Sequence, residues 1–152
     1  MKKLRIYADT SVFGGCFDEE FQVESRKLFD AVRGGAFVLV VSDAVLAELQ
    51  GAPKKVRDIV RGLDPATVEF VAITTEVENL RDAYLNAGVV GPDSREDAEH
   101  IAIAVVSDVD LVASWNFKHI VHYDKIAGYN AVNLLNGYRP VQIFSPKEIV
   151  EP

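Results

Sequence analysis

Short apolar runs alternate with segments of helical periodicity along the 152-residue chain, and this alternation limits the possible folds more than any other feature. Residues 37–41 form a continuous apolar run rich in β-branched side chains, which is typical of a parallel strand covered on both faces. Further strands are expected at residues 4–8, 68–73, 110–113 and 141–144. Strands that alternate with helices predict an α/β fold with a parallel sheet between helices.

Helices are expected between these strands, and residues suited to capping mark several of their starts. Ser42, Thr74 and Ser94 each precede an apolar periodic segment and can accept a hydrogen bond from the first helical turn. The expected helices cover about residues 20–33, 42–50, 53–62, 74–88, 95–106 and 116–135. Residues 10–15 are expected to form a polar, glycine-rich turn, and the residues after 144 a polar tail.

Length and composition are those of an ordinary soluble domain. Hydrophobic residues make up 49% and charged residues 26% of the chain, and the expected organisation is a single domain over residues 1–152. The one cysteine, Cys16, cannot form an internal disulfide and is expected to pack as a small apolar residue. No apolar stretch approaches the roughly 20 residues that cross a bilayer, so we expect a cytoplasmic protein without a membrane partner.

The net charge of −7 argues against a protein that holds nucleic acid by bulk electrostatic attraction. It leaves open an enzyme that meets phosphates through bound cations, because clustered carboxylates are what hard divalent ions require. A basic partner is the other explanation of the imbalance.

Three acidic residues stand near the ends of expected strands. Asp9 follows the first strand, Glu48 lies in the helix after the second, and Asp97 lies in the first turn of the helix before the fourth. Ligands of parallel α/β sheets gather where the strands end at their carboxyl side, so these residues are expected to share one crevice. Carboxylates bind Mg²⁺ or Mn²⁺, and such an ion can activate a water for phosphodiester hydrolysis.

Spacing alone leaves a structural role open for each of these acids. Asp9 could cap the turn after its strand, and Glu48 could be a solvated charge on a helix surface. Asp97 stands three residues after Ser94 in a capping-box pattern, where a carboxylate is favourable without any function. Asn116, just after the fourth strand, is suited to cap the next segment.

Four segments resemble the conserved motifs of the PIN-domain family, especially the VapC-like toxin ribonucleases. They are residues 6–13, 42–49, 97–104 and 111–117, and the resemblance spans residues 4–145. It implies a three-layer α/β/α sandwich with a mostly parallel central sheet. The order and spacing of the motifs are more specific than any motif alone.

The resemblance also implies a function and a set of site residues. The expected activity is that of a ribonuclease dependent on Mg²⁺ or Mn²⁺, the toxin of a type II toxin–antitoxin pair, with RNA as substrate. A homodimer and a cognate antitoxin are the implied protein partners. Asp9, Glu48 and Asp97 take the catalytic metal-binding positions, and Ser11 takes a hydroxyl position that orients Asp9 or meets the metal through water. Asn116 replaces an aspartate common in the family, so we expect one strong cation site and a weak second one.

Several residues near these motifs have two interpretations. His100 could touch a metal-bound water or a phosphate, but a helix-surface or satisfied core histidine is favoured. Lys118 and His119 begin a small basic cluster that could meet the RNA backbone or form a solvated surface. Trp115 and Phe117 could stack on a base, but core packing is favoured.

The alternative function is a noncatalytic PIN-like module that binds protein or RNA with the same surface. The presence of all three principal carboxylates speaks against it. Tight partner binding without metal dependence or cleavage would favour it.

Overall fold

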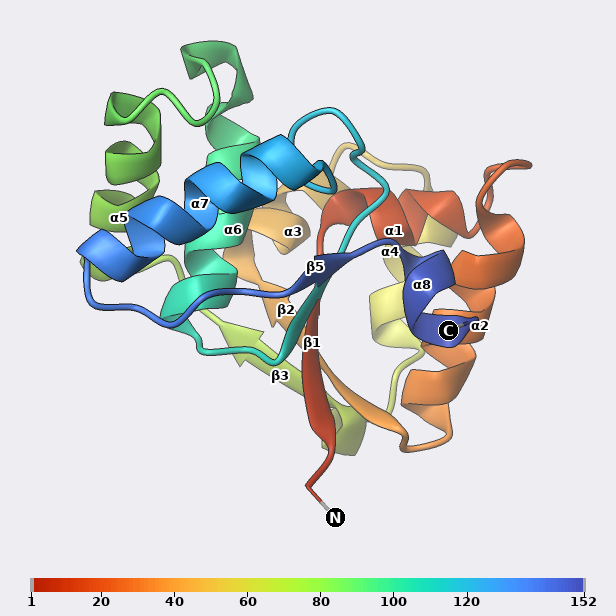
Figure 1. Cartoon of the computed structure of the whole chain (residues 1–152). Helices are drawn as coiled ribbons and strands as arrows, with labels where there is room; N and C mark the ends of the chain where they lie inside the picture. Colours follow the sequence, from red (N-terminus) through yellow and green to blue (C-terminus); the bar gives the residue numbers. More distant parts are fainter. Residues whose placement is uncertain (1, 152) are drawn as a thin grey trace.

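The computed structural model describes residues 2–151, and its centre is a five-stranded sheet in which all neighbouring strands are parallel (Figure 1). The strand order is β3-β2-β1-β4-β5. The strands are β1 (Leu4–Ala8), β2 (Phe37–Ser42), β3 (Val68–Val71), β4 (Leu111–Ala113) and β5 (Ile143–Phe144). The parallel sheet predicted from the alternating pattern is therefore confirmed, and every strand lies within one or two residues of its expected position.

Helices cover both faces of the sheet and complete a three-layer sandwich (Figure 1). One face carries α5 (Thr75–Asn86), α6 (Arg95–Val106) and α7 (Tyr123–Leu135). The other carries α1 (Thr10–Gly15), α2 (Gln22–Arg33), α4 (Lys54–Arg61) and α8 (Pro146–Val150), while α3 (Asp43–Leu49) follows the end of β2. Two short 3₁₀ turns, Pro65–Thr67 and Pro92–Ser94, precede β3 and α6. The α/β/α architecture expected from the resemblance is the architecture found.

The central strand β1 lies between β2 and β4. After β1, the chain adds β2 and β3 on one side of it and then β4 and β5 on the other. Ile6 pairs with Leu39 of β2 on one side, and Ala8 pairs with Ala113 of β4 on the other. The connections that leave β1 and β4 pass to opposite faces, so their carboxyl ends border a crevice. Asp9 stands at this point.

Three expectations about local structure were wrong. Residues 10–15 form the helix α1 rather than a turn. The segment expected as helix from Asn116 makes a turn first, and the helix begins at Tyr123 after His122 accepts a hydrogen bond from the Asp124 amide. The expected polar tail forms α8, because Ser145 and Glu148 make a reciprocal capping box around Pro146.

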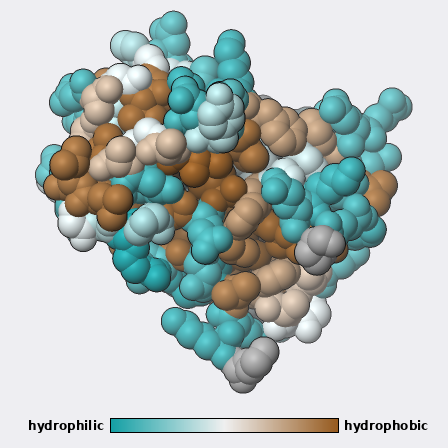
Figure 2. Space-filling view, viewed as in Figure 1, coloured by the Kyte–Doolittle hydropathy of each residue, from teal (hydrophilic) through white to brown (hydrophobic). Residues whose placement is uncertain are grey.

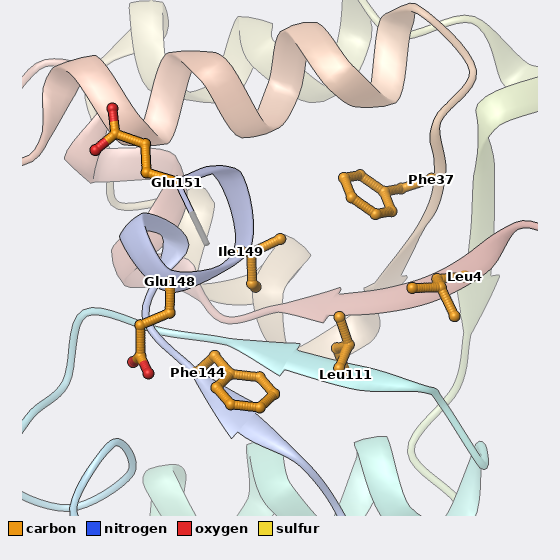
Figure 3. A pocket seen from close by; sticks show the side chains of 7 residues that line it. All are labelled: Leu4, Phe37, Leu111, Phe144, Glu148, Ile149 and Glu151. Carbon is orange, nitrogen blue, oxygen red and sulfur yellow. The ribbon is translucent and has the colours of Figure 1, made fainter.

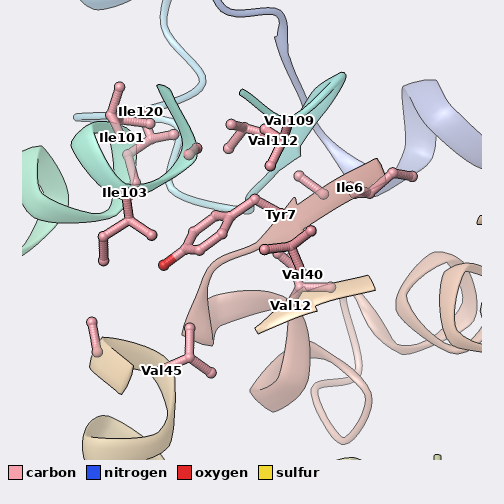
Figure 4. Packing of buried hydrophobic residues seen from close by; sticks show 14 of the residues in the cluster. Ile6, Tyr7, Val12, Val40, Val45, Ile101, Ile103, Val109, Val112 and Ile120 are labelled. Carbon is pink, nitrogen blue, oxygen red and sulfur yellow. The ribbon is translucent and has the colours of Figure 1, made fainter. Parts of the chain in front are cut away.

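The core is continuous from the sheet into both helical layers, and its central members are fully buried (Figure 4). Figure 4 shows the Tyr7 side chain leaving β1 and reaching between Ile103 of α6 and Val45 of α3. Cys16 is 4% exposed, as predicted, and burial raises the pKa of its thiol to about 11. Within residues 2–151, every helix is too short or too polar to cross a membrane.

Candidate functional site

A cleft of about 200 Å³ opens at the carboxyl ends of β1 and β2 and beside the start of α6. It contains all three acids that the sequence singled out, contributed by three separate parts of the fold. Its lining residues are Asp9, Thr10, Ser11, Glu48, Glu96, Asp97, His100 and Asn116. The sheet therefore brings together residues that are up to 107 positions apart in the sequence.

Asp9 is 4% exposed, and both of its carboxylate oxygens accept hydrogen bonds. Ser11 donates to Oδ1, and Ser114 donates to Oδ2 at 2.6 Å. These two hydroxyls are themselves oriented by backbone amides, Trp115 N–H to Ser11 Oγ and Asn116 N–H to Ser114 Oγ, both at 2.9 Å. Asp9 makes no capping hydrogen bond to α1, so the capping alternative for this residue is wrong.

Burial raises the pKa of Asp9 above its ordinary value, although His100 and the two serine hydroxyls oppose the shift. The charge of Asp97 raises it further. A buried carboxylate with a raised pKa gains from a nearby cation, because the cation offsets the desolvation of the charged form. The environment of Asp9 is therefore suited to a positive ligand.

Glu48 is anchored at both carboxylate oxygens rather than solvated on a helix surface. Thr10 donates to Oε2, and His100 Nε2 lies 2.9 Å from Oε1. Burial opposes ionisation, but the hydrogen bond and charge of His100, with the bond from Thr10, outweigh it and lower the pKa of Glu48. Glu48 is thus held as a carboxylate that points into the protein rather than a free surface charge.

His100 is 4% exposed and both ring nitrogens have partners, so of the two favoured interpretations the satisfied core histidine holds and the helix-surface one does not. Its Nδ1 lies 2.6 Å from the Tyr7 hydroxyl, and its Nε2 faces Glu48. Burial lowers the pKa of His100, but the bond to Glu48 and the nearby carboxylates together raise it above the ordinary value. The residue supports the cleft through Glu48.

Asp97 is half-buried in the first turn of α6 and faces the cleft. Ser94 makes no side-chain capping bond, because it ends a 3₁₀ turn with φ −108° and ψ 26° that leads directly into the helix. The capping-box interpretation of Ser94 and Asp97 is therefore wrong. Burial raises the pKa of Asp97 and Glu48 adds to the shift, while His119 and Asn116 oppose it.

Asn116 lies at the edge of the cleft, and its side-chain oxygen is already used in a turn. Oδ1 accepts from the backbone amides of His119 at 2.9 Å and Lys118 at 3.2 Å. These bonds close a turn rather than cap a helix, because α7 begins only at Tyr123, so the N-cap prediction for Asn116 was wrong. The two amides occupy the oxygen that a second cation would need.

Sequence reasoning missed three residues that complete the cleft. Ser114 and Thr10 bind the carboxylates directly, and Tyr7 binds His100. A signal for Ser114 existed, since it follows β4 as Asp9 follows β1. Tyr7 carried no signal, because an aromatic residue inside a buried strand is ordinarily core packing.

The side chains of the cleft fit a hard divalent cation. Carboxylate, hydroxyl and amide oxygens are the donors that Mg²⁺ and Mn²⁺ prefer. Among residues 2–151, no three His, Cys, Asp or Glu side chains are grouped so that together they could hold a metal ion. Mg²⁺ sites in nucleic-acid enzymes commonly use one or two carboxylates and keep several waters, so the open arrangement agrees with that ion.

Next to the cleft, the turn after β4 carries an aromatic cluster and the basic residues. Trp115 is buried and stacks on Phe21 with ring centroids 4.2 Å apart, which confirms its core packing. Gly15 permits the close approach of α1, because a Cβ there would lie 2.9 Å from Trp115 Nε1. Phe117 is 49% exposed, so the expectation of core packing is wrong for this residue. Lys118 is exposed beside it.

A larger hollow of about 500 Å³ lies elsewhere and is apolar (Figure 3). Leu4, Leu111 and Phe144 of the sheet face Phe37 and Ile149 across it. Figure 2 shows apolar surface on this face of the molecule, over the region of β5 between α7 and α8. Its two acids are Glu148 of α8 and Glu151, which directly follows α8, and the other lining residues are apolar. The smaller polar cleft is the better candidate for chemistry.

No family model matches the sequence. No curated protein matches it either. Solved structures that share its fold at low identity include the following three.

The structure of VapBC2 from Rickettsia felis, bound to a DNA fragment from their promoter, is 14% identical, with a TM-score of 0.55 over 93% of this chain and 98% of that chain. The sarcin–ricin loop cleaving toxin VapC20 of Mycobacterium tuberculosis is 15% identical, with a TM-score of 0.53 over 90% and 98%. FitAB bound to the IR36 DNA fragment is 15% identical, with a TM-score of 0.57 over 93% and 94%. The chain therefore has the fold of the VapC-like proteins that its motifs resemble.

Proposed function

We propose that this protein is a ribonuclease dependent on Mg²⁺ or Mn²⁺, with Asp9, Glu48 and Asp97 as its metal-binding residues. The observation that carries the proposal is the meeting of these three acids in one cleft, at the carboxyl edge of the sheet. The side-chain capping bonds that competed for these acids are absent, since neither Asp9 nor Ser94 makes one, although Asp97 keeps its favourable place in the first turn of α6. The shared fold with a toxin that cleaves the sarcin–ricin loop supports RNA as the substrate.

The chain's own groups would hold and orient the reacting parts. A bound divalent ion supplies charge stabilisation for the phosphodiester and lowers the pKa of a water. Ser11 and Ser114 hold Asp9, and Thr10 and His100 hold Glu48, so the carboxylates do not need to reorganise when the ion binds. Lys118 is exposed in the turn beside the cleft, and in this proposal it would meet the RNA backbone.

Asn116 supports one strongly held cation and a weak second. Its oxygen is bound by two backbone amides, and its amide adds no negative charge to the site. A second ion would therefore depend on the RNA phosphates for most of its ligands. Titration with Mn²⁺ in the absence of RNA tests this proposal, and one tight binding event is expected.

RNA cleavage by purified protein tests the activity. Cleavage is expected with Mg²⁺ or Mn²⁺, to stop with EDTA, and to fall in Asp97→Asn by more than the roughly 10–100-fold typical of residues that only support a metal ligand. Asp93→Asn is the matched control, because it removes the same charge from an exposed position one turn before Asp97. Undiminished cleavage by Asp97→Asn contradicts the mechanism. Tight RNA or protein binding without cleavage favours a noncatalytic module.

The biological role we propose is that of a cytoplasmic toxin that forms a homodimer and is held by an antitoxin. The structures that share the fold include toxin–antitoxin assemblies on DNA. A net charge of −7 also suits a partner with basic segments. Light scattering tests the dimer. Co-expression with a small neighbouring reading frame tests the antitoxin, and relief of growth arrest is the expected result.

A further inference from the structure

A chain of hydrogen bonds runs from the backbone of α3 through three buried side chains to the Glu48 carboxylate. Val45 N–H donates to Ser42 Oγ at 3.2 Å, and Ser42 Oγ lies 2.8 Å from the Tyr7 hydroxyl. The Tyr7 hydroxyl lies 2.6 Å from His100 Nδ1, and His100 Nε2 lies 2.9 Å from Glu48 Oε1. The links come from β1, the end of β2, α3 and α6, so the chain ties four elements together.

The chemistry of each group gives this chain a direction. A carboxylate only accepts hydrogen bonds, so the proton on Nε2 of His100 faces Glu48. When His100 is neutral, its Nδ1 has a lone pair and Tyr7 donates to it. Ser42 then donates to Tyr7 while it accepts from the Val45 amide. Every donor and acceptor in the chain is satisfied, which is what burial demands.

The depth of the chain separates it from an ordinary surface network. Tyr7 and Ser42 are 0% exposed and His100 is 4% exposed, so water cannot replace a missing link. The chain reaches the cleft at its His100–Glu48 end, where the Glu48 side chain is 32% exposed. The position of the carboxylate is therefore tied to rigid, buried structure on the His100 side and to Thr10 on the other.

We propose that Tyr7 is a positioning residue that acts through His100 to hold the Glu48 carboxylate in place for the divalent cation. The proposal rests on the proposed function in one respect, that Glu48 is a ligand of this cation. Tyr7 itself touches neither the cation nor the RNA. Its hydroxyl fixes the plane of the imidazole, and the imidazole fixes the carboxylate.

Calorimetric titration with Mn²⁺ alone tests the proposal without relying on cleavage. Tyr7→Phe removes only the hydroxyl, and we expect its Mn²⁺ affinity to fall roughly 10-fold, as for other residues that orient a metal ligand. Tyr84→Phe is the matched control. Tyr84 is also 0% exposed, and its hydroxyl is hydrogen-bonded to Asn133 outside the cleft. This control is expected to bind Mn²⁺ as the parent does.

A double-mutant cycle separates positioning from a general loss of stability. His100→Gln keeps an N–H donor for Glu48 without the imidazole that Tyr7 orients, whereas His100→Leu removes the donor. We expect His100→Gln to bind Mn²⁺ more tightly than His100→Leu. We also expect Tyr7→Phe to have little further effect in the His100→Gln background, because the two residues act along one path.

The outcomes distinguish this proposal from the proposed function. Two outcomes overturn the positioning role alone. One is a Mn²⁺ affinity of Tyr7→Phe equal to that of the parent. The other is a double variant whose loss of Mn²⁺ affinity is the product of the losses in Tyr7→Phe and His100→Gln. If Tyr7→Phe does not fold, equal Mn²⁺ affinities of His100→Gln and His100→Leu overturn it instead. A parent protein that binds no Mn²⁺ overturns both. Tyr7-dependent Mn²⁺ binding without RNA cleavage overturns the ribonuclease and leaves the positioning role standing.

Discussion

The polar cleft and the apolar hollow are the two concave regions that differ most in chemistry. The cleft at the carboxyl ends of the strands holds about 200 Å³ and is lined by acids, hydroxyls, a histidine and an amide. The hollow holds about 500 Å³ and is lined mainly by leucine, isoleucine and phenylalanine side chains (Figure 3). Leu4 and Phe37, which open β1 and β2, belong to the hollow, whereas Asp9 directly follows β1 and lines the cleft.

The comparison shows that volume and apolar area do not locate the chemistry in this fold. What distinguishes the cleft is convergence, because the Asp9 and Glu48 carboxylates are held by groups from other elements. Asp9 receives Ser114 from the end of β4, and Glu48 receives His100 from α6. The cleft keeps charged groups partly desolvated, which costs stability, whereas apolar contacts around the hollow contribute stability. The following predictions test this contrast, from the largest expected effect to the smallest.

Metal binding should stabilise the cleft strongly. A ligand that binds only the folded protein stabilises it by about 2.7 kcal/mol when its free concentration is 100 times its Kd. We expect saturating Mn²⁺ to raise the Tm of the parent by several degrees and that of Asp97→Asn by much less. Differential scanning calorimetry measures this. An equal rise in both proteins would mean that the ion binds elsewhere.

Substitution in the hollow should change stability without changing activity. Leu111 is half-buried in β4, and Leu111→Ala should lower the free energy of unfolding by about 1–2 kcal/mol, below the range for fully buried leucines. Urea denaturation measures the loss. The rate of RNA cleavage per folded molecule is expected to stay within about twofold of the parent rate. A large drop in that rate would contradict the prediction and show that the hollow contributes to RNA cleavage.

Loss of the Asp97 charge should stabilise the metal-free protein in a pH-dependent way. The pKa of Asp97 is raised above its ordinary 3.8, so the folded state binds this proton more tightly than the unfolded state does. The associated stability is present at low pH and is lost as the pH rises through the folded-state pKa. We expect Asp97→Asn to exceed the parent in Tm at pH 7 in EDTA, with the difference shrinking toward pH 4. A difference that grows on acidification would contradict the raised pKa.

Much of the fold was predictable because local rules and tertiary packing agree. Residues 39–41 are fully buried as their composition indicated, although Phe37 and Val38 are only partly buried, and Ser42 and Thr74 cap α3 and α5 as expected. Disagreement arose where one rule competed with another. Gly14 and Gly15 favoured a turn, yet α1 forms there, and Gly15 is needed because of the close approach of Trp115 and Ser25.

The sequence indicated the three acids and the contact of Ser11 with Asp9, but not the other groups that hold the carboxylates. Asp9 follows β1, Glu48 lies in the short helix after β2, and Asp97 lies in the first turn of α6, and such positions are expected near the carboxyl edge of the sheet. Tyr7 contacts His100, 93 positions away, and Ser114 contacts Asp9, 105 positions away. No local sequence pattern predicts contacts over such separations. From the sequence alone, Glu48 resembles any charged residue on a helix surface. Its contact with His100 is seen only in the structure.

Crystals soaked in MnCl₂ and measured at the manganese absorption edge test the central claim most directly. The account predicts an anomalous peak in the polar cleft, within coordination distance of carboxylate oxygens of Asp9, Glu48 or Asp97, and no such peak in crystals of Asp97→Asn. A cleft without manganese at a concentration that supports RNA cleavage would contradict it, as would a peak whose ligands include none of the three acids.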